Sequence, residues 1–187
     1  MSKASGEGHR SPKESVWDYP RPPRIEADTR HVVVRHRGVT LADSHPCLRV
    51  LETSHPPTFY VPRSDARVEL LSMSEGRRRS VCEWKGVATH WTLQGTAGHP
   101  PVPGAAWSYE EPRPGYEAIA GHIAFYPELV EGCTVDGEPV RAQAGGFYGG
   151  WITDEVTGPF KGEPAPWAGD RASPRIRRFR GRQEAGP

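Results

Sequence analysis

Residues 51–62 read Leu-Glu-Thr-Ser-His-Pro-Pro-Thr-Phe-Tyr-Val-Pro, and this stretch constrains the fold more than any other part of the chain. The consecutive prolines at positions 56 and 57 disfavour the α region for the residues before them. The stretch is therefore not helical. We predict an apolar strand over Cys47–Leu51, a stiff proline corner, and a second short strand over Thr58–Val61.

The same stretch carries candidate functional side chains. A carboxylate (Glu52), an imidazole (His55) and a phenol (Tyr60) lie within nine residues. Rigid loops that carry mixed ionisable groups are common places for binding and catalytic sites. The sequence therefore predicts a site at this corner, without indicating its reaction.

Outside this stretch, the composition favours short strands and many turns. The chain has 187 residues, enough for one domain with its own core, and contains 21 glycines and 20 prolines. Such frequent chain breakers favour strands over long helices. We predict a mainly β fold of antiparallel strands with at most two short helices, one of them a single turn within Gly115–Ala120.

Several apolar runs support this prediction. The Asp-Gly pair at 136–137 is typical of a tight hairpin turn. Strands are predicted over His31–Arg37, Val39–Asp43, Val68–Met73, Ser80–Lys85, Val87–Leu93, Ala105–Tyr109, His122–Tyr126, Cys133–Val135 and Pro139–Arg141.

The two ends of the chain differ from the middle. Residues 1–14 are polar and are predicted to form a flexible leader, followed by one domain over 15–168 with N- and C-terminal straps rich in aromatic residues and prolines. Residues 169–187 are predicted to be a basic disordered tail, because six arginines against one glutamate give residues 171–187 a charge of +5 in a chain of total charge +1. Nucleic-acid binding rests on this tail alone and is disfavoured.

The cysteines and hydropathy indicate a cytoplasmic protein. The three cysteines are far apart and form no Cys-x-x-Cys pair, which excludes a disulfide framework and a structural zinc site. Residues 1–15 lack the apolar segment of a signal peptide, and no apolar run approaches the ~20 residues that span a bilayer. We expect no membrane association, and the sequence leaves the oligomeric state open.

The eight histidines form no His-x-x-x-His pair or Cys/His cluster. His45 and His55 could still converge with Glu52 around a metal ion, but an isolated histidine is more often a surface or core residue. We therefore expect neither a metal nor another cofactor.

A second motif, Ser-Val-Cys-Glu-Trp-Lys-Gly-Val-Ala-Thr-His-Trp, lies at residues 80–91. Its first predicted strand ends at Lys85, and Gly86 follows as a bend. A lysine at such a bend can point into a groove, whereas the alternative is an exposed lysine paired with Glu83 across a sheet. Strand alternation would place Cys82 beside Trp84 and away from Lys85. Cys82 is then either a redox thiol or, as we favour, a buried structural thiol.

Taken together, these motifs resemble a known bacterial family, catalogued as domain of unknown function 427. The resemblance covers residues 25–137, and a longer actinobacterial subgroup resembles the flanking aromatic segments. It is carried by Glu52…Tyr60-x-Pro62, Cys82-x-Trp84-Lys85-Gly86-x-Ala88, Ala106-Trp107-x-Tyr109-x-x-Pro112 and Ile123-Ala124-Phe125-Tyr126.

The resemblance implies a β-tent, in which two antiparallel sheets meet at an angle. The β-tent proteins that hold zinc use Cys-x-x-Cys pairs, and type B methionine sulfoxide reductases share the architecture. A nucleotidyltransferase label is attached to the family, but such enzymes hold catalytic metals with paired aspartates, and this chain contains no Asp-x-Asp.

Two classes of function remain, both with a small-molecule ligand. The first is a metal-independent enzyme that performs acid/base chemistry on a small polar metabolite, with Glu52 as general acid or base, His55 as its partner and Lys85 stabilising negative charge. The second is a non-catalytic module that binds its ligand in an aromatic cage. In either class the predicted substrate-binding residues are Tyr60, Cys82, Trp84, Trp107 and Tyr109.

Overall fold

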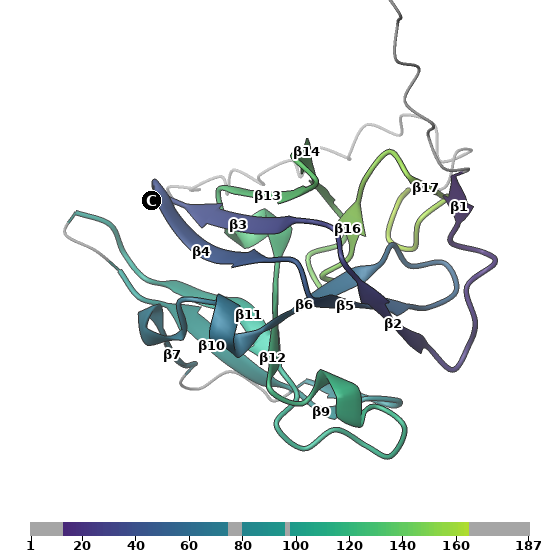
Figure 1. The fold of residues 1–187 in the computed structure, drawn as a ribbon, viewed down its shortest axis with the longest axis horizontal. Coiled ribbons are helices and arrows are strands. Elements are labelled where there is room, and N and C mark those ends of the chain that lie inside the picture. Colours follow the sequence, from purple (N-terminus) through teal and green to yellow (C-terminus); the bar gives the residue numbers. More distant parts are fainter. Residues whose placement is uncertain (1–12, 75–79, 96–97, 165–187) are drawn as a thin grey trace, which may run out of the picture.

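A seven-stranded antiparallel sheet forms the larger layer of the computed structural model, which describes residues 13–74, 80–95 and 98–164 (Figure 1). Its strands run in the order β2-β5-β6-β12-β11-β10-β7. Their bounds are β2 Arg24–Asp28, β5 Cys47–Leu51, β6 Thr58–Pro62, β7 Leu71–Met73, β10 Thr89–Leu93, β11 Val102–Ser108 and β12 His122–Phe125.

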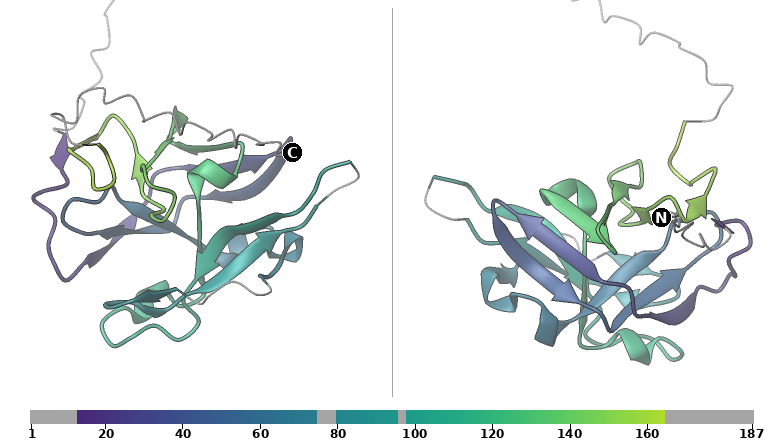
Figure 2. Two further views of the ribbon diagram at one scale, coloured as in Figure 1. Left: turned by 180° about the vertical axis from the view of Figure 1, so that it is seen from behind. Right: turned by 45° about the horizontal axis from the view of Figure 1, so that its top comes forward.

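A four-stranded antiparallel sheet, in the order β14-β13-β3-β4, packs over part of the larger one (Figures 1 and 2). The mainly β fold of two principal antiparallel sheets, predicted from the sequence, is confirmed. The bounds of this second sheet are β3 Val32–His36, β4 Val39–Ser44, β13 Gly132–Val135 and β14 Glu138–Pro139.

Both predicted hairpins of the smaller sheet form, although the strand predicted over Pro139–Arg141 is wrong in its second half, because Arg141 pairs with Ile152 of another strand. In each, two consecutive residues at the turn have positive φ, with 50° and 75° at Arg37 and Gly38 and 49° and 79° at Asp136 and Gly137. Positive φ at both central residues defines the turn whose twist matches that of the flanking strands.

Strand alternation divides the larger sheet between two hydrophobic cores. In β6, Phe59 and Val61 enter the core between the two sheets, whereas Tyr60 points to the opposite face. That face carries a second core that includes Trp107 and Tyr126. Because both faces are covered at this point, β6 is buried without a break from Phe59 to Val61. The second core provides one side of the candidate site described below.

The terminal straps pack against one another. Strand β1 (Glu14–Ser15) pairs in parallel with β17 (Val156–Thr157), and Trp17 Nε1 donates a hydrogen bond to the carbonyl of Pro159 at 2.9 Å (Figure 1). Glu14, predicted as the last residue of the leader, is instead ordered in β1, because its carboxylate accepts hydrogen bonds from two side chains, Tyr19 at 2.6 Å and Arg49 at 3.0 Å.

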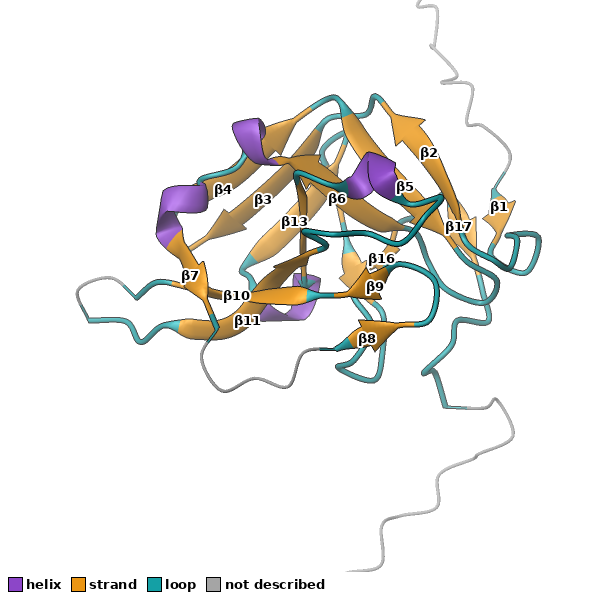
Figure 3. Cartoon of the chain, turned by 90° about the horizontal axis from the view of Figure 1, so that it is seen from below, coloured by secondary structure: helices purple, strands orange, loops and turns teal. Residues whose placement is uncertain are grey.

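Helical residues occur only as short 3₁₀ turns within the described part of the chain (Figure 3). Four such turns are present where the sequence indicated at most two short helices, and the predicted turn within Gly115–Ala120 is one of them. The strand predicted over Val68–Met73 is wrong in its first half, because only Leu71–Met73 pairs with β10. The turns are η1 Arg63–Asp65, η2 Val68–Leu70, η3 Glu117–Ile119 and η4 Pro127–Leu129.

Four more short strands complete the described part of the chain. Strands β15 (Arg141–Ala142) and β16 (Trp151–Ile152) pair with each other, and a short hairpin of β8 (Val81–Cys82) and β9 (Gly86–Val87) precedes β10. Most of the predicted leader and the whole basic tail lie outside the described residues. Among the described residues, no helix is long and apolar enough to cross a membrane.

Candidate active site

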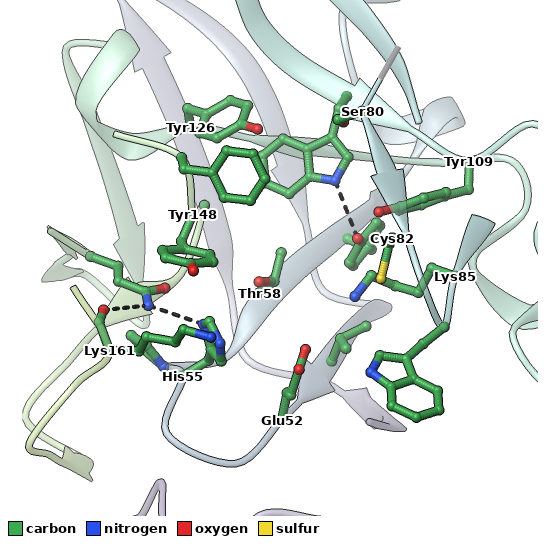
Figure 4. A pocket seen from close by; sticks show the side chains of 18 of the residues that line it. Glu52, His55, Thr58, Ser80, Cys82, Lys85, Tyr109, Tyr126, Tyr148 and Lys161 are labelled. Atoms are coloured by element: carbon green, nitrogen blue, oxygen red, sulfur yellow. Dashed lines mark hydrogen bonds between the residues drawn. The ribbon is translucent and has the colours of Figure 1, made fainter. Parts of the chain in front are cut away.

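A cavity of about 730 Å³ opens between the second core, the proline corner, the β8–β9 hairpin and the segment before β16 (Figure 4). Its volume lies within the range of about 300–1,000 Å³ that accommodates small-molecule ligands. Every residue that the sequence assigned to the site lines this cavity: Glu52, His55, Tyr60, Cys82, Trp84, Lys85, Trp107 and Tyr109.

The proline corner places Glu52 at the cavity. Strand β5 ends at Leu51, and the His55 amide donates to the Glu52 carbonyl at 2.9 Å, which closes a tight turn before the two buried prolines. The turn is anchored from outside, because the Thr53 hydroxyl donates to the carbonyl of Tyr19 at 2.5 Å. The carboxylate of Glu52 therefore extends into the cavity from a fixed backbone (Figure 4).

Lys85 reaches the same space by a route that differs from the prediction. The expected strand over Ser80–Lys85 ends at Cys82, which pairs with Gly86, so Glu83, Trp84 and Lys85 form the hairpin turn. Alternation stops at the turn, and Cys82, Trp84 and Lys85 all line the cavity. The alternative pairing of Lys85 with Glu83 does not occur, because Glu83 binds Arg21 at 2.7 Å.

The charges around the cavity are available to a ligand. Among the residues that the structure describes, no cation lies within 4.0 Å of the Glu52 carboxylate, and no carboxylate lies within that distance of the ammonium groups of Lys85 or Lys161. Figure 4 shows Glu52, Lys85 and Lys161 around the same space.

His55 is held as a neutral hydrogen-bond donor. Burial lowers its pKa, and the charges of Lys161 and Lys85 lower it further, while Glu52 and Gln143 act in the opposite direction. The two amide hydrogens of Gln143 have two acceptors, the carbonyl of Lys161 at 2.8 Å and His55 Nδ1 at 3.1 Å. Because Nδ1 accepts, the hydrogen of neutral His55 is on Nε2.

The tautomer and charge of His55 are directly measurable. We expect long-range ¹H–¹⁵N spectra at pH 7 to show Nδ1 unprotonated and Nε2 protonated, with charging displaced to a pH below the ordinary value of about 6.5. As pH falls through about 6.5, the unfolded chain takes up this proton first, so His55 should lower the free energy of unfolding there until the folded pKa is passed. A His55 signal that titrates at or above 6.5 would contradict this arrangement.

Aromatic side chains wall the cavity. Trp107 Nε1 donates to the Tyr60 hydroxyl at 3.3 Å, and the Trp107 and Tyr126 rings lie 4.3 Å apart between centroids. Burial raises the pKa of both Tyr60 and Tyr109, so each hydroxyl remains protonated at neutral pH. Gly149 permits this packing, because a Cβ there would lie 2.0 Å from Trp107 Cη2. The tyrosines therefore supply hydroxyl groups, not charge.

Cys82 is not the buried structural thiol that strand alternation indicated. It is half-buried, lines the cavity and shares a hydrogen bond with Tyr109. The other two thiols are enclosed in the core between the sheets, where burial raises the pKa of Cys47 to about 11 and that of Cys133 to about 12.

We therefore expect the native protein to react with iodoacetamide at Cys82 first, while Cys47 and Cys133 become reactive only on unfolding. Peptide mass spectrometry after brief labelling at pH 8 would check this order. The Cys82→Ser variant is the matched control and should remain unlabelled while folded. Labelling of Cys47 or Cys133 at the rate of Cys82 would contradict the assignment.

Several cavity residues were missed by the sequence interpretation. Ser80 Oγ lies 2.7 Å from His90 Nε2 at one end of the cavity, and Gln143, Tyr148 and Lys161 line another side. Residues 145–151 read Gly-Gly-Phe-Tyr-Gly-Gly-Trp, a pattern that indicates a closely packed aromatic segment but not its partner. Nothing in the sequence linked Gln143 or Lys161 to the proline corner, since these contacts depend on the long-range path of the chain.

The metal hypothesis gains no geometric support. In the described ranges, no three histidine, cysteine or acidic side chains are grouped so that they would hold a metal ion. His45, the proposed partner of His55, stacks on His31 with ring centroids 4.7 Å apart. His55 instead binds Gln143.

The fold and cavity together define a mainly β protein with a cavity lined by charged and aromatic side chains. Comparison with known families identifies Domain of unknown function (DUF427), which matches residues 24–136. The match covers more than half of the chain, so the protein belongs to this family, as its motifs indicated. No curated protein matches the chain.

Proposed function

We propose that the protein is a metal-independent enzyme that performs acid/base chemistry on a small polar metabolite bound in the cavity. One observation carries the proposal: Glu52, Lys85 and Lys161 converge on this cavity, yet none of these charges is paired with another described side chain. Glu52 and Lys85 are half-buried whereas Lys161 is exposed, and leaving partly desolvated charges such as the first two unpaired is costly. Clusters of this kind concentrate at sites where a ligand or reaction uses them.

The geometry suggests a division of roles. Glu52 is the only carboxylate on the fixed proline corner and serves as the proton acceptor and donor. Lys85 extends toward the same space and would stabilise negative charge that develops on the substrate. Neutral His55, with its hydrogen on Nε2, acts as a hydrogen-bond donor, and in this role it is the partner of Glu52.

A non-catalytic binding module is the second candidate. The observation that favours it is the aromatic wall of Tyr60, Trp107, Tyr109 and Tyr126, a surface that binds cations and flat ligands without chemistry. Such a cage needs one charge to orient its ligand, whereas this cavity presents three.

A single screen separates the two candidates. The full chain, treated with EDTA, is incubated in D₂O with a panel of small hydroxy, oxo and amino acids, and ¹H spectra are recorded over hours. We expect at least one compound that shows binding also to lose a C–H signal or give a new product. Binding without chemical change in any compound would favour the module, and turnover that appears only after added metal would overturn metal independence.

We further propose that the protein acts in the cytoplasm of a bacterium. Cys47, Cys82 and Cys133 are free thiols, as expected for a reducing compartment. Fractionation of the source cells, with immunodetection of the protein, tests this location.

A further inference from the structure

One wall of the cavity comes from a segment outside the residues matched by the family. The match ends at residue 136, whereas Gln143, Tyr148 and Lys161 line the cavity. Trp151 anchors this segment, since its amide donates to the Pro57 carbonyl at 2.8 Å and its indole N–H to the Phe125 carbonyl at 3.2 Å. The segment from 143 to 161 is therefore an integral side of the site.

The backbone around Lys161 is fixed from both directions. Its amide donates to the carbonyl of Ser54 at 2.8 Å, and its own carbonyl accepts from Gln143 Nε2 at 2.8 Å. The ammonium lies 5.5 Å from the centre of the Tyr148 ring, and its charge acts on the neighbouring His55. Lys161 and the Nε2–H of His55 thus supply a cation and a neutral donor to the same cavity at the proline corner (Figure 4).

The charges lining the cavity do not balance. Glu83 also lines it, but its carboxylate is bound to Arg21 at 2.7 Å. Among the lining residues that the structure describes, the remaining fixed charges are Lys85 and Lys161 against Glu52, an excess of one positive charge, and His55 adds none while neutral. A ligand that carries one negative charge would neutralise this excess, whereas a dianion would reverse it.

We propose that Lys161 and His55 form a subsite for one carboxylate group, and that the natural ligand is a small monocarboxylic acid with an otherwise uncharged body. Lys161 pairs with the carboxylate and the His55 Nε2–H donates to it, which leaves the uncharged body facing Glu52 and Lys85. This inference deepens the proposed function by naming its substrate class. Binding at the subsite nevertheless needs no catalysis, so the two are tested separately.

Two pairs of probes test the subsite: lactate with lactamide, and mandelate with mandelamide. Each pair has nearly the same shape and differs in the carboxylate charge. Dissociation constants are measured by ¹H–¹⁵N NMR titration of the full chain at pH 7. In at least one pair we expect the acid to bind about tenfold or more tightly than the amide. Equal affinities within both pairs, or no binding of either acid, would overturn the proposal.

Lys161→Met should remove this preference, while Lys161→Arg should keep it, because both leave the backbone bonds of residue 161 in place. Lys13→Met, which removes an exposed lysine that does not line the cavity, is the matched control and should behave as the native chain. An unchanged preference in Lys161→Met would refute the role of Lys161. Competition by inorganic phosphate at lower concentration than either acid would refute the monocarboxylate assignment.

Glu52→Gln separates this proposal from the proposed catalysis. Removing that negative charge should leave acid binding intact or strengthen it, whether or not any substrate is turned over. If acids bind as expected and the screen finds no turnover, the subsite stands and the enzyme proposal fails. If turnover occurs on a neutral compound and Lys161→Met leaves it unchanged, the enzyme proposal stands and the carboxylate subsite fails.

Discussion

Replacing Glu52 with glutamine should lower kcat for the substrate by about 10²-fold or more and leave its Kd within a few-fold. The amide keeps the size of the side chain and its carbonyl acceptor, but it cannot take up a proton. The proline corner is held by backbone bonds, with His55 N–H donating to the Glu52 carbonyl at 2.9 Å, so the substitution leaves its geometry in place. Steady-state kinetics and titration on the same preparation measure the two quantities.

Glu69→Gln provides the matched control, because Glu69 is an exposed carboxylate on η2 that binds Arg67 and does not line the cavity. It should retain native kcat. If Glu52→Gln turns over substrate at the native rate, Glu52 is not the proton acceptor. If both variants lose activity equally, the effect is not specific to the cavity carboxylate.

Local sequence signals predicted the candidate site better than the paths of its strands. The prolines at 56 and 57 fix a non-helical corner whatever the rest of the chain does, so the positions of Glu52 and His55 at a strand end followed directly. The turns at Gly38 and Asp136-Gly137 were equally predictable, because glycine readily adopts the positive φ that each turn requires. In each case the determinant lies within four residues of what it determines.

Predictions failed where a distant contact decided the structure. The motif around Cys82 reads as one strand, but Cys82 pairs with Gly86 in a hairpin, and this change of direction brings Cys82 and Lys85 to the same cavity. Glu83 binds Arg21, which is 62 residues away in the chain, and not its neighbour Lys85. The alternation of side chains between the two faces of a strand is a local rule. It does not indicate where a strand ends and a turn begins.

The C-terminal wall was the least predictable part of the site. Gln143 and Lys161 contact the corner because Trp151 inserts into the core between the sheets, where its ring lies 5.2 Å from that of Phe59. The glycine-rich segment indicated close packing but not its partner. The position of this segment therefore depends on how much the packing of Trp151 contributes to the free energy of unfolding, and this contribution can be measured.

Trp151→Ala should lower the free energy of unfolding by about 3–5 kcal/mol, among the largest losses available to a single substitution in this chain. The side chain is 1% exposed, so its removal leaves a cavity in the main core, and it also deprives the Phe125 carbonyl of the indole N–H that binds it at 3.2 Å. Urea unfolding followed by circular dichroism gives the free energy, and the midpoint should fall with little change in slope.

Phe147→Ala is the control within the same segment, because Phe147 is 67% exposed and most of its ring already contacts solvent. It should cost less than about 1 kcal/mol. The loss in free energy of unfolding for Trp151→Phe should lie between those of the two alanine variants, since phenylalanine keeps an aromatic ring but lacks the N–H donor.

A loss below about 1 kcal/mol in Trp151→Ala would show that the segment from 143 to 161 unfolds independently of the sheets. In that case the core would not fix the wall that carries Gln143 and Lys161. Only the backbone bonds of Lys161 to Ser54 and Gln143 would then hold this lysine at the proline corner.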